Sequence, residues 1–339
     1  MNMAADCDKL QSAAISIRNC KKGDQPMKIA MIGAGAAGSV FAAYLKRGGA
    51  DMYLLDKYQA HMDKIASDGL LLREFDREYR LSGFHTAPDA GELPIMDLVI
   101  LMVKCTQTQE IMPSVMPCIG PETVVVSLQN GLCNEECITP YVEQERLILG
   151  FGKIGTELPE PGVCVAKPEP GTAMYFGAAA PSPLTERAGR ELERLFLSGG
   201  CQASFEDDIQ PYIWRKAIAN CGYNAVSAVL GLPVGPVLRS ESGSAIVRQV
   251  WQECCAVAEA RGIHGLAGEM EHERERLLKG FSDYYPSMAQ DIIRRRQTEI
   301  EHMNGAIARF GRELGVPTPV NQLVTDMILT IQSNYEYKK

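Results

Sequence analysis

Short apolar runs recur through the first half of the chain, each followed by a polar or glycine-rich segment. Such runs are typical of strands that helices cover on both faces of a parallel sheet. The strands that they predict are Ile29–Ile32, Asp51–Asp56, Asp97–Val103 and Thr123–Leu128. The pattern between the first two predicts a helix over Ser39–Arg47, so the chain starts with a strand–helix–strand unit.

Shorter β-like segments lie among these strands and after them. Leu70–Arg73 and Glu78–Leu81 predict a strand pair joined by a charged turn. Val163–Lys167 and Ala173–Phe176 lie in a stretch rich in glycine, proline and threonine, and we expect them to complete the same sheet. The sequence Pro-Ser-Pro at 181–183 then predicts the end of the sheet domain.

From residue 184 onward the apolar positions recur with helical spacing. The helices that this spacing predicts are Leu184–Leu197, Asp208–Leu230, Glu241–Arg261, Leu266–Gly280, Ser287–Arg296, Glu299–Leu314 and Pro319–Ser333. We therefore expect an α/β protein in which a Rossmann-type doubly wound sheet domain (27–182) precedes an all-α domain (183–339). Residues 1–26 are polar and aperiodic, which favours a disordered extension or a mis-assigned start.

The turn after the first strand carries glycines in G-x-G-x-x-G spacing, and with a strand before it and a helix after it this predicts a dinucleotide site. The first glycine permits a tight turn, the second lets a pyrophosphate approach the backbone, and the third lets helix and strand pack closely. Free N–H groups at the helix N-terminus then bind the phosphates. The predicted cofactor-binding residues of this turn are Gly33, Ala34, Gly35, Ala36, Ala37 and Gly38.

Asp56 ends the second predicted strand, where an acidic residue accepts hydrogen bonds from the adenosine ribose of a dinucleotide. A carboxylate at this place favours NAD, because it repels a 2′-phosphate. Lys57 follows directly and can pair with that phosphate, so the choice between NADH and NADPH stays open. The competing interpretation of Asp56 is a solvated aspartate at a strand end.

Lys104 and Asn130 come just after two more of the predicted strands. Ligands of open α/β sheets bind outside the carboxyl ends of the strands, so both residues share a rim with the glycine turn. Each alone is compatible with an ordinary loop residue. Their common position favours a functional interpretation.

Three polar side chains interrupt the apolar surface of the predicted helix 208–230: Lys216, Asn220 and Asn224. Their i, i+4, i+8 spacing places them along one stripe of the helix. Burying an ammonium or an amide without partners is costly, so a purely structural helix has no reason to align three of them. We interpret the stripe as the wall of a substrate cleft with Lys216 as proton donor. A solvent-facing helix edge is the alternative.

Ser287 and Glu299 lie at two predicted helix starts that can meet this wall. The segment Pro286–Gln290 resembles a capping box with Ser287 as N-cap, and Thr298 with Glu301 resembles another. A helix start with a free serine hydroxyl is also suited to a carboxylate. Taken singly both residues fit helix capping, and together with the stripe they become candidates for function.

Composition narrows the class of protein. The chain has 339 residues, 46% of them hydrophobic, which is typical of a globular protein of about two domains. A net charge of -8 without a basic block disfavours nucleic acid and anionic membranes as partners. Eleven cysteines without a secretory signal predict reduced thiols and a cytoplasmic location. Neither the five histidines nor Cys133 with Cys137 have the spacing of metal ligands, so we expect no metal site.

These features resemble the ketopantoate reductase (2-dehydropantoate 2-reductase) family over about residues 27–331. Many dehydrogenases share the glycine turn, so the specific part of the resemblance lies in the helical domain. The motifs that carry it are Trp214 with Lys216, Asn220 and Asn224; Ser287-Met288 with Asp291; Thr298-Glu299-Ile300 before Asn304-Gly305; and Pro317-Thr318-Pro319 before Asn321.

The resemblance implies reduction of 2-dehydropantoate to (R)-pantoate with NADPH, a step of pantothenate biosynthesis. It implies that Lys216 is the catalytic acid, that Glu299 is an essential carboxylate near the substrate, and that Lys104 lies at the cofactor edge of the cleft. The residues that match positions in contact with the substrate or the lysine are Asn130, Asn220, Asn224 and Ser287.

The chain departs from the family pattern at two places. NADP-dependent members usually carry a basic residue where this chain has Asp56, and many have an asparagine where it has Tyr284. Relatives that use NAD and reduce other 2-oxo acids vary at both positions. An NAD-dependent D-2-hydroxy acid dehydrogenase for branched or aromatic 2-oxo acids is therefore the first alternative. A dinucleotide-binding redox sensor without turnover is an alternative of another class, and both a monomer and a homodimer stay open.

Overall fold

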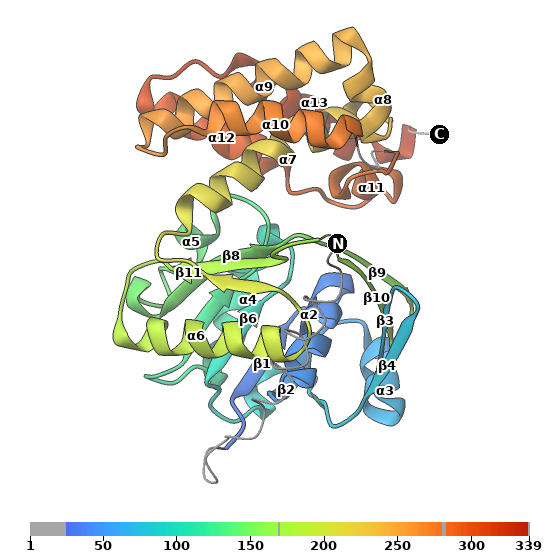
Figure 1. Ribbon diagram of the computed structural model, residues 1–339, viewed down its shortest axis with the longest axis vertical. Helices are drawn as coiled ribbons and strands as arrows, with labels where there is room; N and C mark the ends of the chain where they lie inside the picture. Colours follow the sequence, from blue (N-terminus) through green and yellow to red (C-terminus); the bar gives the residue numbers. More distant parts are fainter. Residues whose placement is uncertain (1–24, 169, 280–282, 338–339) are drawn as a thin grey trace, which may run out of the picture.

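A computed structural model describes residues 25–168, 170–279 and 283–337 of the chain. Figure 1 shows a sheet-containing part and a bundle of helices, with helix α7 leading from one into the other. Most of the extension that we expected to be disordered, residues 1–24, lies outside the described residues.

The sheet part is built on an eight-stranded sheet in the order β12-β11-β8-β7-β6-β1-β2-β5. All pairings from β8 to β5 are parallel, whereas β11 runs antiparallel to β8. This is the doubly wound arrangement that the apolar runs predicted. The strands are β1 (Lys28–Ile32), β2 (Asp51–Leu55), β5 (His85–Thr86), β6 (Leu98–Leu101), β7 (Val124–Ser127), β8 (Leu147–Gly152), β11 (Met174–Ala178) and β12 (Ala203–Phe205).

Helices cover both faces of this sheet. In β1, Ile29 and Met31 belong to one core cluster and Ala30 and Ile32 to the other, because successive side chains point to opposite faces. This burial on both faces explains why continuous apolar runs marked the strands. The covering helices are α2 (Ala36–Arg47) and α6 (Pro183–Ser198) on one face, and α4 (Thr108–Val115) and α5 (Asn134–Ile138) on the other.

A second sheet of four strands, in the order β4-β3-β10-β9, packs beside α2. The predicted strand pair is confirmed as the β3–β4 hairpin. The placement of residues 163–167 in the large sheet was wrong, since β10 pairs with β3 and β9. Strands β3 and β10 are far apart in the sequence, and no local pattern reveals such a pairing. The strands are β3 (Leu70–Glu74), β4 (Arg77–Leu81), β9 (Ile154–Glu160) and β10 (Val163–Pro168), and α3 (Gln59–Asp68) precedes them.

Helix α7 (Gln210–Leu230) is central to the all-α part, which the sequence predicted. It packs against α8, α9, α10, α11 and α13, while α12 packs against α9 and α13. Helix α8 was not predicted, because its Val-Gly-Pro sequence suggested only a turn. The further helices are α8 (Val234–Arg239), α9 (Glu241–Ala260), α10 (Leu266–Lys279), α11 (Ser287–Ile293), α12 (Asn304–Leu314) and α13 (Pro319–Gln332).

Helix α6 and strand β12 pack with the sheet part, although the expected boundary at residue 182 assigns them to the helical domain. Helix α6 lies on α2, and β12 pairs with β11 at the edge of the sheet. Phe196 is buried, and its ring centroid lies 6.3 Å from that of Phe41 in α2 and 6.2 Å from that of Phe176 in β11. The Pro-Ser-Pro sequence begins α6, where Ser182 forms a capping box, so we place the boundary between β12 and α7.

Replacing Phe196 with alanine is expected to destabilise the protein by about 3–5 kcal/mol, because the surrounding helix and strands cannot close the cavity. Denaturant unfolding followed by circular dichroism measures the loss. The neighbouring Leu197 is 44% exposed, so Leu197→Ala is the matched control. That control is expected to cost less than about 1 kcal/mol. Equal stability of the two variants would contradict the packing of α6 against the sheet.

Candidate active site

The glycine turn joins β1 to α2 and leaves room for a pyrophosphate. Gly33 has φ +97°, and a Cβ there would lie 2.7 Å from the backbone nitrogen of Val103. A Cβ on Gly38 would lie 1.9 Å from the Gly33 carbonyl oxygen, so close packing of α2 on the turn requires glycine. At Gly35, in contrast, an added Cβ would meet nothing within 4 Å among the described residues beyond its own stretch of chain. The open space beside Gly35 and the N-terminus of α2 therefore fits a dinucleotide.

A buried histidine fixes the shape of this turn. The N–H of Gly162 donates to His61 Nδ1 (2.9 Å), so the neutral ring carries its proton on Nε2 and donates to Ser39 Oγ (2.9 Å). Ser39 in turn donates to the carbonyl of Ala34 in the turn (2.7 Å). Burial lowers the pKa of His61, against the opposing charge of Asp56, and so favours this neutral ring. A lone histidine gave no signal in the sequence.

Asp56 and Lys57 directly follow β2, as predicted. Asp56 Oδ1 accepts a hydrogen bond from the N–H of Tyr58 (2.8 Å), so this carboxylate also holds the turn into α3. Lys57 is 82% exposed and its Nζ lies 3.7 Å from Glu110 Oε1. Because β2 is the neighbour of β1, both residues lie where the adenosine half of a dinucleotide is expected.

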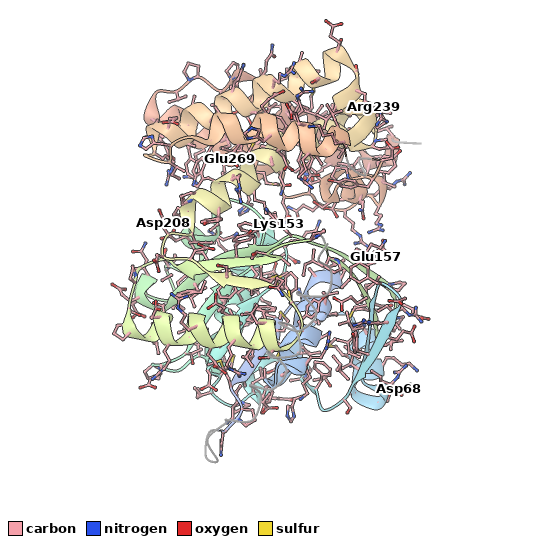
Figure 2. The ribbon with its side chains drawn as sticks, viewed as in Figure 1. Asp68, Lys153, Glu157, Asp208, Arg239 and Glu269 are labelled. Carbon is pink, nitrogen blue, oxygen red and sulfur yellow. The ribbon has the colours of Figure 1, made fainter. Side chains whose placement is uncertain are left out.

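The strand order places the candidate polar residues along one rim of the sheet. Passing from β2 through β1, β6 and β7 to β8, the carboxyl ends carry Asp56, the glycine turn, Lys104, Asn130 and Lys153. Lys153 was not predicted, because we treated residues 147–177 only as short β-like pieces. Lys153 directly follows β8, a strand that the sequence pattern did not predict, so its place at a strand end was not recognised. Figure 2 shows Lys153 where the sheet part faces the helical part.

Lys216 extends from α7 to this rim. Its Nζ donates to the carbonyl of Gly152 at the end of β8 and lies 4.8 Å from the centre of the Phe151 ring. Burial lowers the pKa of Lys216 to about 8, the charge of Lys153 acts in the same direction, and the charge of Glu299 opposes both. An ammonium with this pKa transfers its proton near neutral pH more readily than an ordinary lysine does.

Glu299 connects the helical part to the sheet part. The N–H of Cys105, just after β6, donates to Glu299 Oε1 (3.1 Å). The predicted helix 299–314 is interrupted, because a 3₁₀ turn over Ile300–His302 precedes α12. This interruption leaves the His302 carbonyl to accept a hydrogen bond from the N–H of Leu132 (2.9 Å). The segment around Glu299 is therefore a contact between the two parts.

Lys104 also reaches across this junction. Its Nζ lies 2.6 Å from Asp291 Oδ2 on α11 and donates to the Gln297 carbonyl at 2.5 Å. Lys104 lies on the rim as predicted, but its charge is balanced by Asp291 of the helical part. Lys104 thus positions α11 over the sheet.

The predicted stripe on α7 is present, but its asparagines have other partners than expected. Asn224 Nδ2 donates to Ser287 Oγ (3.1 Å), and its Oδ1 accepts from the N–H of Met288 (2.9 Å). Asn220 Oδ1 accepts from the hydroxyl of Tyr223 (3.1 Å). No hydrogen bond joins either asparagine to Lys216 in the described part of the chain, so the expectation that they orient the lysine is not met.

The two predicted capping boxes are absent. The N-cap of α11 is Pro286, and Ser287 is the first helical residue, so its side chain does not cap the helix. Thr298 Oγ1 accepts from the N–H two residues on (3.4 Å), but Glu301 returns no bond among the described residues. The hydroxyl of Ser287 is left exposed beside the stripe and can donate to a ligand.

Asn134 holds the loop that carries Asn130. Its Nδ2 donates to the carbonyl oxygens of Gln129, Asn130 and Gly131 at 3.2, 3.1 and 3.4 Å. These bonds fix Asn130 on the rim between β6 and β8. Sequence reasoning missed Asn134, because it is the first residue of α5 and not the N-cap, which is Cys133.

Two residues of the family motifs stabilise the helical part itself. Asn304 Nδ2 donates to the carbonyl of Cys221 (3.1 Å) and to Asn321 Oδ1 (3.0 Å). Asn321 Nδ2 in turn donates to Glu253 Oε2 (2.7 Å). This network joins α7, α9, α12 and α13, so these asparagines support packing and do not face a ligand.

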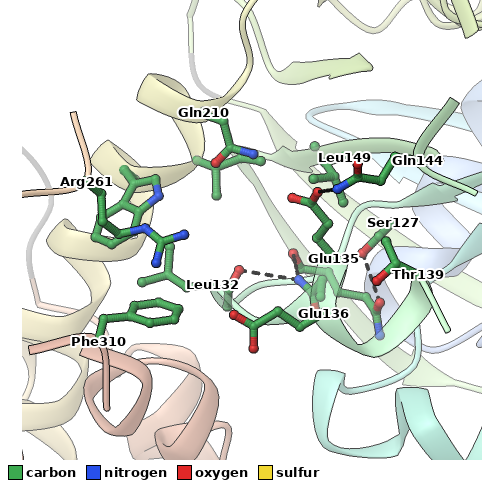
Figure 3. Close-up of a pocket in the computed structure, with 16 residues that line it drawn as sticks. Ser127, Leu132, Glu135, Glu136, Thr139, Gln144, Leu149, Gln210, Arg261 and Phe310 are labelled. Carbon is green, nitrogen blue, oxygen red and sulfur yellow. Dashed lines mark hydrogen bonds between the residues drawn. The ribbon is translucent and has the colours of Figure 1, made fainter. Parts of the chain in front are cut away.

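A cavity of about 280 Å³ lies between the two parts. Figure 3 shows Arg261 and Phe310 on one side of it and Glu135 on the other. The described residues that line it include none of the predicted catalytic or substrate-binding side chains. This cavity is therefore distinct from the junction around Lys216, where the candidate residues lie. In the described part of the chain, no cluster of histidine, cysteine or acidic residues could hold a metal ion. Every helix of that part is too short or too polar to cross a bilayer.

A turn that fits a dinucleotide, together with a buried lysine of α7 that meets the same rim, is the arrangement of an NAD(P)H-dependent oxidoreductase. Comparison with known proteins then gives the family. Profiles described as Ketopantoate reductase PanE/ApbA and Ketopantoate reductase PanE/ApbA C terminal match residues 29–181 and 208–332. The chain belongs to the ketopantoate reductase family, as its motifs predicted.

The chain is similar to several proteins over nearly its whole length. The 2-dehydropantoate 2-reductase of Streptococcus pyogenes serotype M1 is 28% identical over 313 residues, which cover 89% of this chain and 97% of the relative. The PanE/ApbA family ketopantoate reductase from Ralstonia eutropha JMP134 superimposes with a TM-score of 0.80 at 28% identity, covering 92% and 100% of the two chains. D-mandelate dehydrogenase, solved with NADH and anilino(oxo)acetate, has a TM-score of 0.82 at 27% identity, covering 91% and 100%.

The three glycines allow a test of cofactor binding. Gly35→Ala is expected to leave stability nearly unchanged, because the position is open and its φ of -66° suits alanine. It should weaken NADH and NADPH binding at least about tenfold, because a methyl group occupies the space of the pyrophosphate. Gly38→Ala should reduce both stability and binding, because its Cβ meets the Gly33 carbonyl. Fluorescence titration and thermal unfolding measure the two effects, and unchanged cofactor affinity in Gly35→Ala would contradict the assigned site.

Proposed function

We propose that the protein reduces 2-dehydropantoate to (R)-pantoate with NADPH or NADH, as a cytoplasmic step of pantothenate biosynthesis. The observation that carries the proposal is the position of Lys216. The side chain of Lys216 extends from α7, and its ammonium donates to the Gly152 carbonyl at the end of β8. That strand end lies on the rim that also carries the glycine turn. The family and the curated 2-dehydropantoate 2-reductases at 28% identity support the choice of substrate.

The reaction needs a proton at the oxygen of the substrate carbonyl. The glycine turn would hold a reduced nicotinamide dinucleotide, which would supply the hydride to C2 of the 2-oxo acid. Lys216 donates a proton to the C2 oxygen as negative charge develops there. Glu299 favours the charged form of Lys216, because its carboxylate raises the pKa of that lysine. Ser287 and Asn130 bind the polar groups of the substrate from α11 and from the sheet rim.

A second candidate function is the NAD-dependent reduction of aromatic or branched 2-oxo acids to D-2-hydroxy acids. Asp56 favours NADH over NADPH at the ribose end. The structural similarity to D-mandelate dehydrogenase solved with NADH favours an aromatic substrate. Tyr284 and Tyr285, 42% and 38% exposed just before Ser287, offer apolar surface to such a substrate.

One steady-state matrix distinguishes these functions. It tests NADH and NADPH, each with 2-dehydropantoate and with a panel of branched and aromatic 2-oxo acids. The highest kcat/KM with 2-dehydropantoate supports the first proposal, and the highest with an aromatic acid and NADH supports the second. Cofactor binding without turnover of any 2-oxo acid would overturn both and favour a sensor.

Replacing Lys216 with alanine should lower kcat by at least about a hundredfold, because the proton donor is lost. The affinity for NADH and NADPH should change little, since Lys216 lies outside the glycine turn. Arg215→Ala is the matched control on the same helix, because Arg215 pairs with Glu269 at 3.4 Å. Retained turnover in Lys216→Ala would remove Lys216 from the mechanism.

The reduction rate should fall as pH rises through about 8, where Lys216 loses its proton. The sign follows from the role of Lys216, because only the protonated form of a proton donor is active. A pH profile of kcat/KM for the reduction measures this limb. A flat profile between pH 7 and about 9.5 would contradict a donor whose pKa is lowered.

A further inference from the structure

We propose that Lys153 binds the carboxylate of the 2-oxo acid while Lys216 meets its C2 oxygen. Lys153 is then the residue that makes the enzyme select an acid over a neutral carbonyl compound. This inference rests on the proposed function, since it names the carboxylate site of that reaction. The same carboxylate site serves 2-dehydropantoate and the aromatic substrates of the alternative function, because both are 2-oxo acids.

The position of Lys153 in the chain puts it at the reacting end of the rim. It is the single residue between β8 and β9, where the chain leaves the large sheet for the small one. Its own N–H is fixed by the Ala173 carbonyl (2.6 Å). The residue before it, Gly152, carries the carbonyl to which Lys216 donates. Figure 2 shows Lys153 on the side of the sheet part that faces the helices.

Each of the two ammonium groups lies over one ring of a stacked aromatic pair at the rim. Phe151 of β8 and Tyr175 of β11 are paired across the strands, with ring centroids 5.5 Å apart. Lys216 Nζ lies 4.8 Å from the centre of the first ring, and Lys153 Nζ lies 5.3 Å from the centre of the second. Ring faces attract cations, so these contacts favour keeping both charges at the rim.

A 2-oxo acid matches two neighbouring cations. During reduction it carries negative charge on its carboxylate and develops negative charge on the C2 oxygen, on adjacent carbons. One ammonium that donates its proton to C2 oxygen cannot also neutralise the carboxylate. The charge of Lys153 also lowers the pKa of Lys216, which fits two ammonium groups close to each other.

The test compares acids with neutral analogues in variants of Lys153. The substrates are 2-dehydropantoate and phenylglyoxylate, each beside its uncharged form, 2-dehydropantolactone and methyl phenylglyoxylate. The variants are Lys153→Gln, which removes the charge, and Lys153→Arg, which keeps it. Lys167→Gln is the matched control, since Lys167 is an exposed lysine of β10 that pairs with Glu157.

Lys153→Gln should raise KM for the acid about 10- to 100-fold, with a smaller change in kcat, because a charge-assisted contact is lost. The neutral analogue should be affected less than about threefold, so the preference for the acid disappears. Lys153→Arg should retain most of that preference, and Lys167→Gln should retain all of it. Affinity for NADH and NADPH, measured by fluorescence, should be unchanged in all variants.

The pH profile of the reduction rate distinguishes a charge effect of Lys153 from a merely structural role, which would leave the falling limb in place. Removing the charge of Lys153 should shift the falling limb of the reduction rate to higher pH, because Lys216 then keeps its proton longer. A Lys153→Gln enzyme with the wild-type preference for acids and an unshifted limb would overturn the inference.

Binding of the product class separates this inference from the proposed function. If the wild-type protein reduces no 2-oxo acid, the proposed function fails. Calorimetric binding of pantoate and of D-mandelate to the protein saturated with NAD⁺ or NADP⁺ then decides the role of Lys153. Loss of that binding in Lys153→Gln supports the carboxylate site. Unchanged binding in Lys153→Gln overturns it, and so does the absence of binding in the wild type.

Discussion

The burial of one ammonium group between two structural units is the constraint on which the site depends. An ammonium taken out of water must find acceptors, and Lys216 finds the Gly152 carbonyl, the Phe151 ring and the charge of Glu299. The first two belong to β8 and the third to the segment before α12. The lysine is therefore in its working environment only while the sheet rim and the helical part are in contact. The lowered pKa of Lys216 is therefore a property of the junction, and not of α7 alone.

Contacts that cross in both directions hold that junction. Lys104 extends from the sheet to Asp291 on α11, while Glu299 extends from the helical part to the backbone of Cys105. Arg309 of α12 lies 2.5 Å from Glu136 of α5, which adds a third link. Lys104 and Glu299 were also candidates from the sequence, so two of the predicted site residues contribute to holding the two parts together.

Local patterns predicted what local physics determines. Apolar runs identified the strands of the large sheet because both faces are buried, and the glycine spacing identified the turn because two of its glycines are sterically required. The partners of the predicted side chains depend on distant elements. The pairing of β10 with β3, the bonds from Asn224 to α11, and the bond from Lys216 to the Gly152 carbonyl all join segments far apart in the chain. No spacing rule contains that information. The position of the polar stripe on α7 was therefore predicted correctly, while the hydrogen-bond partners of its side chains were not.

The series of hydrogen bonds from Gly162 through His61 and Ser39 to Ala34 has a thermodynamic consequence for the small sheet. Gly162 lies in the turn between β9 and β10, so the cofactor-binding turn is bonded to a different sheet through one imidazole. A ligand that binds only the folded turn stabilises everything whose folding is coupled to that turn. Part of the binding free energy of a dinucleotide would therefore appear as resistance of β9 and β10 to local opening. In this protein the nucleotide is thus expected to act as a folding ligand for strands that it never touches.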